Sequence, residues 1–462
     1  MKILNIITAS LATVLLGSCG LYSKYERPEV PSNTSEIMRD AALYANTTDS
    51  ASFGDVAWRE VFTDPQLQKL IQQGLDNNVD VYKAVAGVKQ VEEALKCARL
   101  AFLPSLAFAP SGTLSKVLTG DYKSDWSKSY ALPVSASWTI DIFGSILAQK
   151  RNAEMSLAMT KDYELAARSG IICGVANSYY TLLMLDRQLE ILNEMEQLTK
   201  DTWEMMKLQY QLGRMRSTSV QSAEAAYLST QTQANDFKRQ IRATENALCL
   251  LIGQAGQQIS RSTLAEQSLP SEFSTGVGMA LLKNRPDVHN AEMQLAACFH
   301  DVQTARSKFY PSISVGFTGA FGNSGGSLNP GKWLTNLFGN LTQPIFNRGA
   351  LTANLKVTKL QYEQAFNTWQ NSILSAGNEV SNALVSYNSY DANSKLETQR
   401  ITVLTKNVED TRALYKSSGS SYLEVLTAQT QLLNAQLTKA ADDFSKMQAV
   451  VSLYTALGGG WK

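Results

Sequence analysis

Apolar residues recur with helical spacing through two very long stretches that contain no proline. These stretches, residues 134–269 and 345–462, are both rich in alanine, leucine, glutamine, glutamate and lysine. In the first, a heptad-like series comprises Leu182, Leu185, Leu189, Leu192, Met195 and Leu198. In the second, a similar series comprises Tyr362, Phe366, Trp369 and Ile373. The spacing predicts long packed helices, and one helix over about 145–211 would be roughly 100 Å long.

Each proline-free stretch is interrupted once, at a matched place. The first interruption is Gly213–Ser217, with Thr218 and Gln221 next as a capping box. The second is Ser417–Ser420, with Ser421 and Glu424 in the same roles. Glycine favours the end of a helix and a capping box favours the start of the next. The pattern therefore predicts two antiparallel helical hairpins.

The chain also repeats itself. A shift of 207 residues aligns two sets of nine identical residues: Asn77, Asp80, Val81, Ala84, Ala98, Arg99, Phe102, Pro104 and Ser105 with Asn284, Asp287, Val288, Ala291, Ala305, Arg306, Phe309, Pro311 and Ser312. A shift of 205 aligns five more: Tyr210, Val220, Ala223, Leu228 and Gln231 with Tyr415, Val425, Ala428, Leu433 and Gln436. A nearly constant shift over such a span predicts duplication of one unit.

Two stretches between the expected helices alternate strictly between apolar and small or polar residues. They are residues 130–141 and 312–321, and weaker signals of the same kind lie at 106–114 and 333–345. About ten residues of such alternation are typical of a membrane barrel strand. The polar segments 118–128 and 322–332 are expected loops, and Pro104 and Pro311 are expected at crossings from helix to strand. Trp126, Trp138 and Trp333 suit membrane interfaces. A soluble sheet facing helices is the alternative.

The amino terminus predicts export and lipid attachment. Met1-Lys2 and an apolar region to residue 18 are typical of a signal peptide. The segment Leu16-Gly17-Ser18-Cys19 resembles a bacterial lipobox, which predicts that Cys19 carries diacylglycerol and an N-acyl chain. Gly20 after the cysteine favours the outer membrane. An ordinary secretory signal with a chance cysteine is the alternative.

No run of 18 or more apolar residues follows Cys19, so membrane crossing requires strands of a closed barrel. Four strands cannot close a barrel, because the smallest known barrels use about eight. Two chains would supply eight strands around a filled lumen, whereas three would supply twelve around a wet channel. The sequence therefore predicts an oligomer, and a trimer fits best.

Composition argues against several classes of function. Lys and Arg number 42 against 41 Asp and Glu, which disfavours nucleic acid as a partner. Two histidines and five cysteines leave little room for His-rich metal sites, acid–base catalysis or a disulfide framework. We expect no enzyme, no metal site and no cofactor. The cysteines after Cys19 are expected to be small core residues: Cys97, Cys173, Cys249 and Cys298.

Eight motifs together resemble the TolC-like outer-membrane efflux channel family, in its lipoprotein branch. The motifs are Trp58 and Phe62 with Asp64 and Leu67; Asn77 to Asp80; Trp138 to Gly144; Arg285 to Val288 with Ala291 and Glu292; Phe309 to Ser312; Gln343 to Phe346 with Gly349; Tyr422 to Leu426 with Ala428 and Gln429; and Ala456 to Trp461. The resemblance implies a homotrimer with a twelve-stranded barrel in the outer membrane of a Gram-negative bacterium and a twelve-helix α-barrel in the periplasm. It also implies a periplasmic adaptor (a membrane fusion protein) and an inner-membrane RND pump as partners.

The same resemblance directs attention to the turns of the hairpins, where the family's resting channel is held shut by polar and charged contacts. Many members have an acidic residue between the turn glycine and the Tyr-Leu pair, but this chain has serines there. The gate candidates are Asp410, Arg412, Tyr415, Lys416, Ser420 and Ser421. The adaptor-contact candidates are Arg214 and Arg216. A solvated turn is the alternative for each.

The predicted fold is a mixed α/β membrane protein with four transmembrane strands per chain, long helical hairpins and an internal duplication. The expected segments are a signal peptide (1–18), a lipidated tether (19–60), a first repeat (61–268) and a second repeat (269–462). The first repeat has a helix, two strands over about 104–142 and a hairpin over 145–253; the second has a helix, two strands over about 311–346 and a hairpin over 349–457.

The expected function is passive export of drugs or metal ions as the outer-membrane channel of a tripartite efflux system. A lipid-anchored coiled-coil scaffold or adhesin without a pore is the alternative. A hydrolase and a channel for one-step protein secretion are less favoured.

Overall fold

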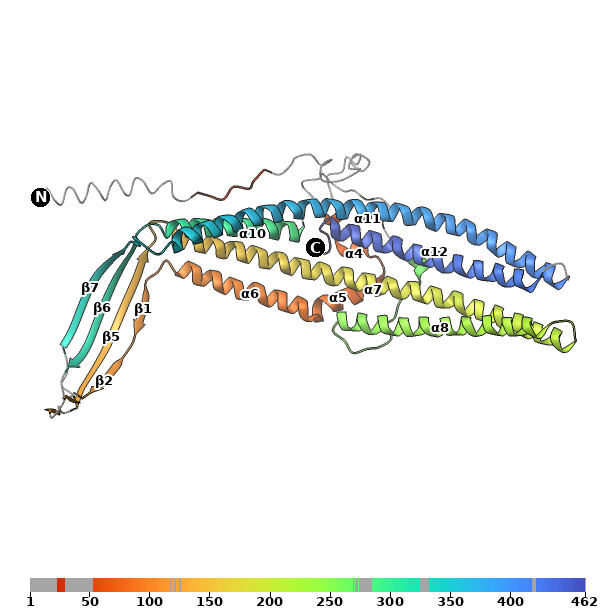
Figure 1. Ribbon diagram of the computed structural model, residues 1–462, viewed down its shortest axis with the longest axis horizontal. Helices are drawn as coiled ribbons and strands as arrows, with labels where there is room; N and C mark the ends of the chain where they lie inside the picture. Colours follow the sequence, from red (N-terminus) through yellow and green to blue (C-terminus); the bar gives the residue numbers. More distant parts are fainter. Residues whose placement is uncertain are drawn as a thin grey trace. The chain divides into compact units, whose positions relative to one another are not determined.

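The computed structural model describes residues 23–29, 53–116, 118–119, 122–123, 126–268, 270, 273, 285–324, 332–417 and 421–461 (Figure 1). The chain forms two compact units, each assembled from separate segments. The strand unit comprises Met1–Glu29, Gly87–Lys161 and Asn290–Gln370. The hairpin unit comprises Val30–Ala86, Asp162–His289 and Asn371–Lys462.

Six long helices of the described residues form three pairs of equal length. The helices α7 (Ser145–Gln211) and α11 (Ala350–Lys416) have 67 residues each. The helices α8 (Ser217–Leu251) and α12 (Tyr422–Ala456) have 35 each, and α6 (Val79–Leu100) and α10 (Pro286–Ser307) have 22 each. The starts of paired helices are offset by 205 or 207 residues, as the repeat in the sequence predicts. The duplication therefore extends to the helices, residue for residue.

The short helices among the described residues lie in the hairpin unit. They are η2 (Phe53–Asp55), α4 (Trp58–Val61), α5 (Pro65–Asn77) and η3 (Leu264–Glu266). Within the described part of the chain, none of the helices combines length with the hydropathy that a bilayer-spanning helix needs.

The predicted heptad seam of α7 is a packed core in the hairpin unit. Leu192 is completely buried and Met195 nearly so, and both join a cluster with Ala234 of α8 and Leu433 of α12. Nearer the turn, the rings of Trp203 and Tyr227 stack with centroids 5.7 Å apart. Burial of this apolar seam, at about 25 cal/mol per Å², is what holds such long helices side by side.

The two hairpin turns differ in how their backbone groups are satisfied. Gly213 has φ +71° and allows a Schellman turn, in which the Arg214 N–H donates to the Gln209 carbonyl at 2.9 Å. Ser421 and Glu424 form the predicted capping box at the start of α12. The box predicted for Thr218 and Gln221 is wrong, because α8 already begins at Ser217 and Arg216 is its N-cap without a side-chain hydrogen bond.

One antiparallel sheet lies in the strand unit, in the order β1-β5-β6-β7 (Figure 1). The strands are β1 (Ser105–Phe108), β2 (Ser111–Ser115), β5 (Ser127–Ile140), β6 (Ser312–Ser324) and β7 (Lys332–Thr342). Both β1 and β2 pair with β5, so they share one position in the sheet, interrupted near Pro110. The sheet therefore has four strand positions.

The loops between the strands are shorter than the sequence predicts. A small ribbon, β3 (Leu118–Thr119) paired with β4 (Tyr122–Lys123), lies inside the expected loop 118–128. The strand β6 extends three residues into the expected loop 322–332, as far as Ser324. The prolines behave as expected, since Pro104 and Pro311 directly precede β1 and β6.

Candidate functional site

The sheet has one apolar face and one small, polar face. The pairing of β5 with β6 sets Trp138 opposite Val315 and Leu132 opposite Phe321, and β7 adds Leu337 opposite Phe317. Because side chains alternate along a strand, all of these lie on one face. In the single chain this face is uncovered: Leu337 is 78% exposed. Such a surface requires an apolar environment.

The opposite face is made almost entirely of hydroxyl, amide and small side chains. On it β5 contributes Ser135, Ser137 and Thr139; β6 contributes Ser312, Ser314 and Thr318; and β7 contributes Asn336, Asn340 and Thr342. None of the polar-face side chains described in the structure is charged. An uncharged hydrogen-bonding surface can solvate many solutes without holding any of them tightly.

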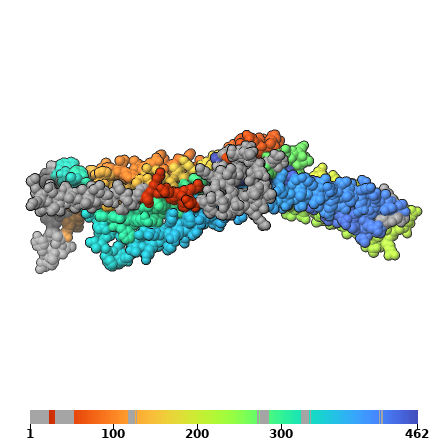
Figure 2. All heavy atoms as spheres, turned by 90° about the horizontal axis from the view of Figure 1, so that it is seen from above, coloured from red at the N-terminus to blue at the C-terminus, as the bar shows by residue number. Residues whose placement is uncertain are grey.

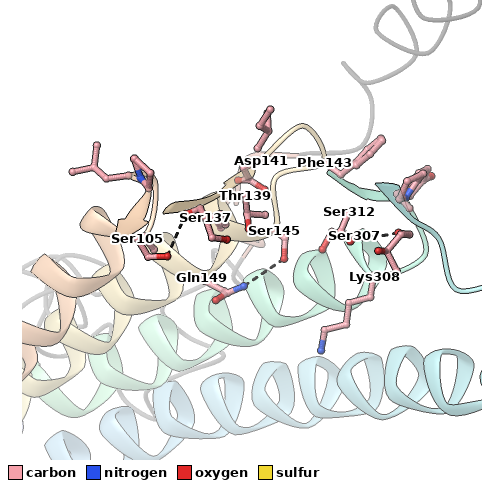
Figure 3. Close-up of a pocket in the computed structure, with 18 of the residues that line it drawn as sticks. Ser105, Ser137, Thr139, Asp141, Phe143, Ser145, Gln149, Ser307, Lys308 and Ser312 are labelled. Carbon is pink, nitrogen blue, oxygen red and sulfur yellow. Dashed lines mark hydrogen bonds between the residues drawn. The ribbon is translucent and has the colours of Figure 1, made fainter. Parts of the chain in front are cut away.

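A cavity of about 790 Å³ lies where this polar face meets the helices of the strand unit (Figure 3). Its lining includes Ser105, Ser137 and Thr139 of the polar face, together with Asp141 and Lys308 from the connections to the helices. The Asp141 carboxylate accepts a hydrogen bond of 2.7 Å from the Leu147 N–H, so it caps the first turn of α7. The cavity therefore continues the polar face towards the helical part of the unit.

The predicted gate residues lie at the far ends of the hairpin helices. Asp410 is exposed and Arg412 half-buried on the last turns of α11, and Lys416 is its last residue. The Tyr415 hydroxyl lies 3.3 Å from Oε1 of Gln209, which joins the end of α11 to the end of α7. Ser421 is used as a helix cap, and Ser420 lies outside the described residues.

Two further predicted sites are the adaptor contacts, Arg214 and Arg216, and the lipid site, Cys19. Arg214 and Arg216 are both in the turn between α7 and α8, and Arg214 is exposed. Cys19 lies outside the described residues.

Residues 23–29, soon after Cys19, form an extended strap within the predicted tether, and its packing on the surface of the strand unit was not expected from the sequence. Figure 2 shows this strap in red along the cyan surface. Gln303 donates to the Ser23 hydroxyl at 2.9 Å, and the Tyr25 ring meets Phe299 edge-on at 5.7 Å. Arg27 forms a 2.7 Å ion pair with Glu292, whose side chain is only 10% exposed.

A polar network in the hairpin unit centres on Asp64. Its carboxylate caps α5 by accepting from the Gln66 N–H at 2.8 Å, and it also accepts from Tyr179 at 2.7 Å and from the Ser262 hydroxyl. Burial alone would raise the pKa of Asp64, but the hydrogen bonds from Ser262, Tyr179, Gln267 and the Gln66 N–H hold it below its usual value. The network ties α5, α7 and the segment after α8 together, which is a structural role.

A second network in this unit surrounds Arg285. Its guanidinium makes bidentate contact with Asp287 at 2.7 and 3.0 Å, reaches Glu379 at 2.7 Å, and donates to the Ala456 carbonyl at 2.9 Å. The side chain is only 8% exposed, so these partners replace its lost hydration. The Arg-Pro-Asp motif therefore fastens the start of α10 to the end of α12.

The described residues contain no group of three or more His, Cys, Asp or Glu side chains that could hold a metal ion. Cys173, Cys249 and Cys298 are buried thiols, as expected. Cys97 is exposed and lines the cavity at the sheet, so its predicted place in a core is wrong. Among the described residues, the arrangement that suggests a function is the two-faced sheet with its cavity.

The profile of the family described as outer membrane efflux protein matches residues 70–254 and 278–459. The chain belongs to this family. The two matched ranges fall one in each half of the duplication. The cation efflux system protein CusC of Escherichia coli K12 is 27% identical over 448 residues, covering 96% of this chain and 97% of that protein. The probable outer membrane lipoprotein SilC of Salmonella typhimurium is 26% identical over 467 residues, covering 99% of each.

Solved structures show the same fold. A crystal structure of CusC, described in terms of folding and transmembrane channel formation, has a TM-score of 0.84 and 26% identity, covering 96% of this chain and all of that chain. The open state of the MtrE channel of Neisseria gonorrhoeae has a TM-score of 0.83 and 24% identity, covering 95% of this chain and 98% of that chain.

The predicted family, the mixed helix and strand fold and the outer-membrane efflux role are thereby confirmed. The scaffold or adhesin without a pore is not favoured, because the family is described as outer membrane efflux protein and the efflux system protein CusC matches over 97% of its length.

Proposed function

We propose that three copies of this chain form a passive export channel for small molecules in the outer membrane of a Gram-negative bacterium. The channel works with a periplasmic adaptor and an inner-membrane RND pump as a tripartite efflux system that exports drugs or metal ions. The observation that carries the proposal is the two-faced sheet, with an apolar face suited to lipid and a polar face, uncharged in its described side chains, suited to a water-filled lumen.

The edges of the sheet require other copies of the chain. Among the described strands, β7 pairs only with β6, and β1 and β2 pair only with β5. A strand edge exposed to lipid would leave backbone N–H and C=O groups unpaired, at a cost of several kcal/mol for each group. Pairing of β7 with the first strand position of the next copy removes every edge. Three copies bring twelve strand positions, enough for a wet lumen.

The strands have the dimensions and aromatic residues that membrane crossing requires. A tilted crossing strand needs about 9–11 residues, and β5, β6 and β7 have 14, 13 and 11. On the apolar face Tyr130, Phe321 and Trp333 form a row near one end of the sheet, with ring centroids 6.5 and 5.4 Å apart. Trp138 lies eight residues from Tyr130 on β5. Two aromatic levels are typical of the two membrane interfaces.

We also propose a lipid anchor at the amino terminus of the chain. Residues 1–18 act as a signal peptide, and Cys19 receives diacylglycerol and an N-acyl chain. Ser23 lies four positions after Cys19, so the extended chain between them reaches at most about 14 Å. The strap at Ser23–Glu29 therefore fixes the strand unit close to the lipid anchor. The segment 19–60 is the tether, and 61–268 and 269–462 are the two duplicated halves.

The turns of the hairpins are proposed as the gate and the adaptor contact. Asp410, Arg412, Tyr415, Lys416, Ser420 and Ser421 form the gate side, and Arg214 and Arg216 form the adaptor side. The Tyr415–Gln209 contact supports this assignment, since it links the ends of the two hairpins in one chain. Opening then requires the helices to move apart at these ends.

The proposal is tested by conductance across a planar bilayer and by heat-modifiable migration on gels. We expect an SDS-resistant trimer that conducts ions. A well-folded trimer without conductance would contradict the proposal.

Neighbouring substitutions on β6 provide a matched control. Phe317 lies on the apolar face and Thr318 on the polar face. An arginine at the bilayer midplane costs about 2–4 kcal/mol on the lipid side of a barrel. Phe317→Arg should therefore reduce the yield of inserted trimer strongly, whereas Thr318→Arg should insert and change the conductance. Equal insertion of both variants would overturn the assignment of the two faces.

A further inference from the structure

One side chain breaks the pattern of the polar face. Phe338 of β7 lies opposite Gly316 of β6, and the register places both on the face that carries Ser137, Thr318 and Asn340. Among the polar-face side chains that the structure describes, Phe338 is the only aromatic one. The ordinary alternation of this sheet would place a serine, threonine or asparagine here.

The Phe338 ring lies flat on the sheet because residue 316 is glycine. A Cβ atom at position 316 would come within 2.3 Å of Cζ and 2.4 Å of Cε2 of the ring, closer than such atoms approach in proteins. The ring therefore occupies the space directly above the Gly316 backbone. Gly316 is buried beneath it, while Phe338 keeps 44% of its surface exposed. The ring covers the sheet with one face and presents the other.

Among the described residues, the nearest polar-face neighbours of this platform are uncharged hydrogen-bonding groups. Ser137 is opposite Gly316 on β5, Ser314 and Thr318 flank Gly316 on β6, and Asn336 and Asn340 flank Phe338 on β7. These groups can accept or donate hydrogen bonds to the polar edges of a solute whose flat face lies on the ring. Aromatic rings prefer offset-stacked or edge-to-face contacts with other rings.

We propose that Phe338, seated on Gly316, is a stacking contact for flat aromatic solutes in transit through the lumen. The inference rests on the proposed channel, because only there does the polar face meet the exported molecules. Three copies place three such platforms around one lumen. The contact is weak, as transport requires, because a solute must leave the site as readily as it enters.

The test measures how two cations of the same charge and similar size block the current through the purified trimer in a planar bilayer. The probes are benzyltrimethylammonium and its saturated analogue, cyclohexylmethyl-trimethylammonium. In the wild type, the aromatic probe should block at a roughly threefold to tenfold lower concentration than the saturated one. In Phe338→Leu this ratio should fall to about one, whereas Phe338→Tyr should keep it.

Two further variants separate stacking from a general disturbance of the barrel. Gly316→Ala keeps the phenylalanine but forces its ring off the sheet, so the ratio should fall. Phe317→Leu removes the neighbouring ring on the opposite face, so the ratio should be unchanged. Ion conductance in each variant reports that the channel has formed.

The outcomes distinguish this inference from the proposed function. Absence of conductance in the wild-type trimer contradicts the channel itself. A conducting wild type with a ratio of one, or an unchanged ratio in Phe338→Leu or Gly316→Ala, overturns the stacking contact and leaves the channel intact.

Discussion

His300 is a histidine buried in a helical part of the strand unit. It lies on α10 in the strand unit, is only 3% exposed, and its Nδ1 atom has no hydrogen-bond partner among the described residues. Burial, reinforced by Arg151, lowers the pKa of His300 to about 4, and Glu154 opposes the shift. The folded chain therefore holds this imidazole neutral at physiological pH.

Because His300 is buried and neutral, we expect the folded chain to lose stability in acid. His300 binds a proton near pH 6.5 in the unfolded chain but only near pH 4 in the folded chain. Its neutral form therefore contributes fully to the free energy of unfolding above pH 6.5, and this contribution is lost as the pH falls from 6.5 to 4. The loss is at most about 3 kcal/mol. Thermal unfolding of the trimer in detergent, followed by circular dichroism from pH 7.5 to pH 4, should show a smaller acid-induced decrease in His300→Phe than in the wild type. Parallel decreases in both proteins would contradict the prediction.

Single residues were predictable where their role is local. Ser421 and Glu424 show their capping box in four consecutive positions, and Pro104 and Pro311 mark the ends of helices by their missing N–H groups. Asp64 is different, because it meets Tyr179 and Ser262 only after more than a hundred residues of chain have folded back. No spacing in the sequence indicates such a meeting.

At the scale of elements, the contacts that hold the strap at Ser23–Glu29 on the strand unit can be tested directly. Its contacts include the Arg27–Glu292 ion pair and the Tyr25–Phe299 ring contact. An exposed or half-buried ion pair contributes about 0–1 kcal/mol, and a ring contact about 0.5–1.5 kcal/mol beyond burial of its area. Together they hold the strap down against local opening.

Replacing both Tyr25 and Arg27 by alanine should release the strap without unfolding the helices. Lys24 is the cleavable site within it, because Pro28 follows Arg27. Limited trypsin digestion of the intact trimer should cleave after Lys24 roughly tenfold faster in the double variant, since cleavage follows the open fraction. Glu26→Ala, in the same strap but with an exposed side chain, is the control. Equal cleavage in the wild type and the double variant would show that the contacts do not secure the strap.

Elements were predictable to the extent that periodicity and proline define them. The 67-residue helices follow from stretches without proline, and β5 and β6 follow from strict alternation. The β3–β4 ribbon escaped detection because its strands have two residues each, too few to show a period. The strap escaped because its position depends on side chains of α10 that lie hundreds of residues away.

At the scale of the whole molecule, each charge at the cavity is repeated in every copy of the chain, and the lining has one charge of each sign, at Asp141 and Lys308. Lys308 lines the cavity beside the polar face, whose described side chains are uncharged. In the proposed trimer we expect three copies of this lysine to lie near the same passage. At 0.1 M ionic strength the Debye length is about 10 Å, so these charges act on permeating ions over a useful distance.

Lys308 should therefore bias the channel towards anions. In a bilayer with a tenfold gradient of potassium chloride, the reversal potential should shift stepwise towards cation preference from wild type to Lys308→Gln to Lys308→Glu. Lys308→Arg keeps the charge and should match the wild type. The shifts should shrink when both solutions contain about 1 M salt, because the Debye length falls to about 3 Å. Identical reversal potentials for wild type and Lys308→Glu at low salt would show that this part of the cavity does not face the permeating ions.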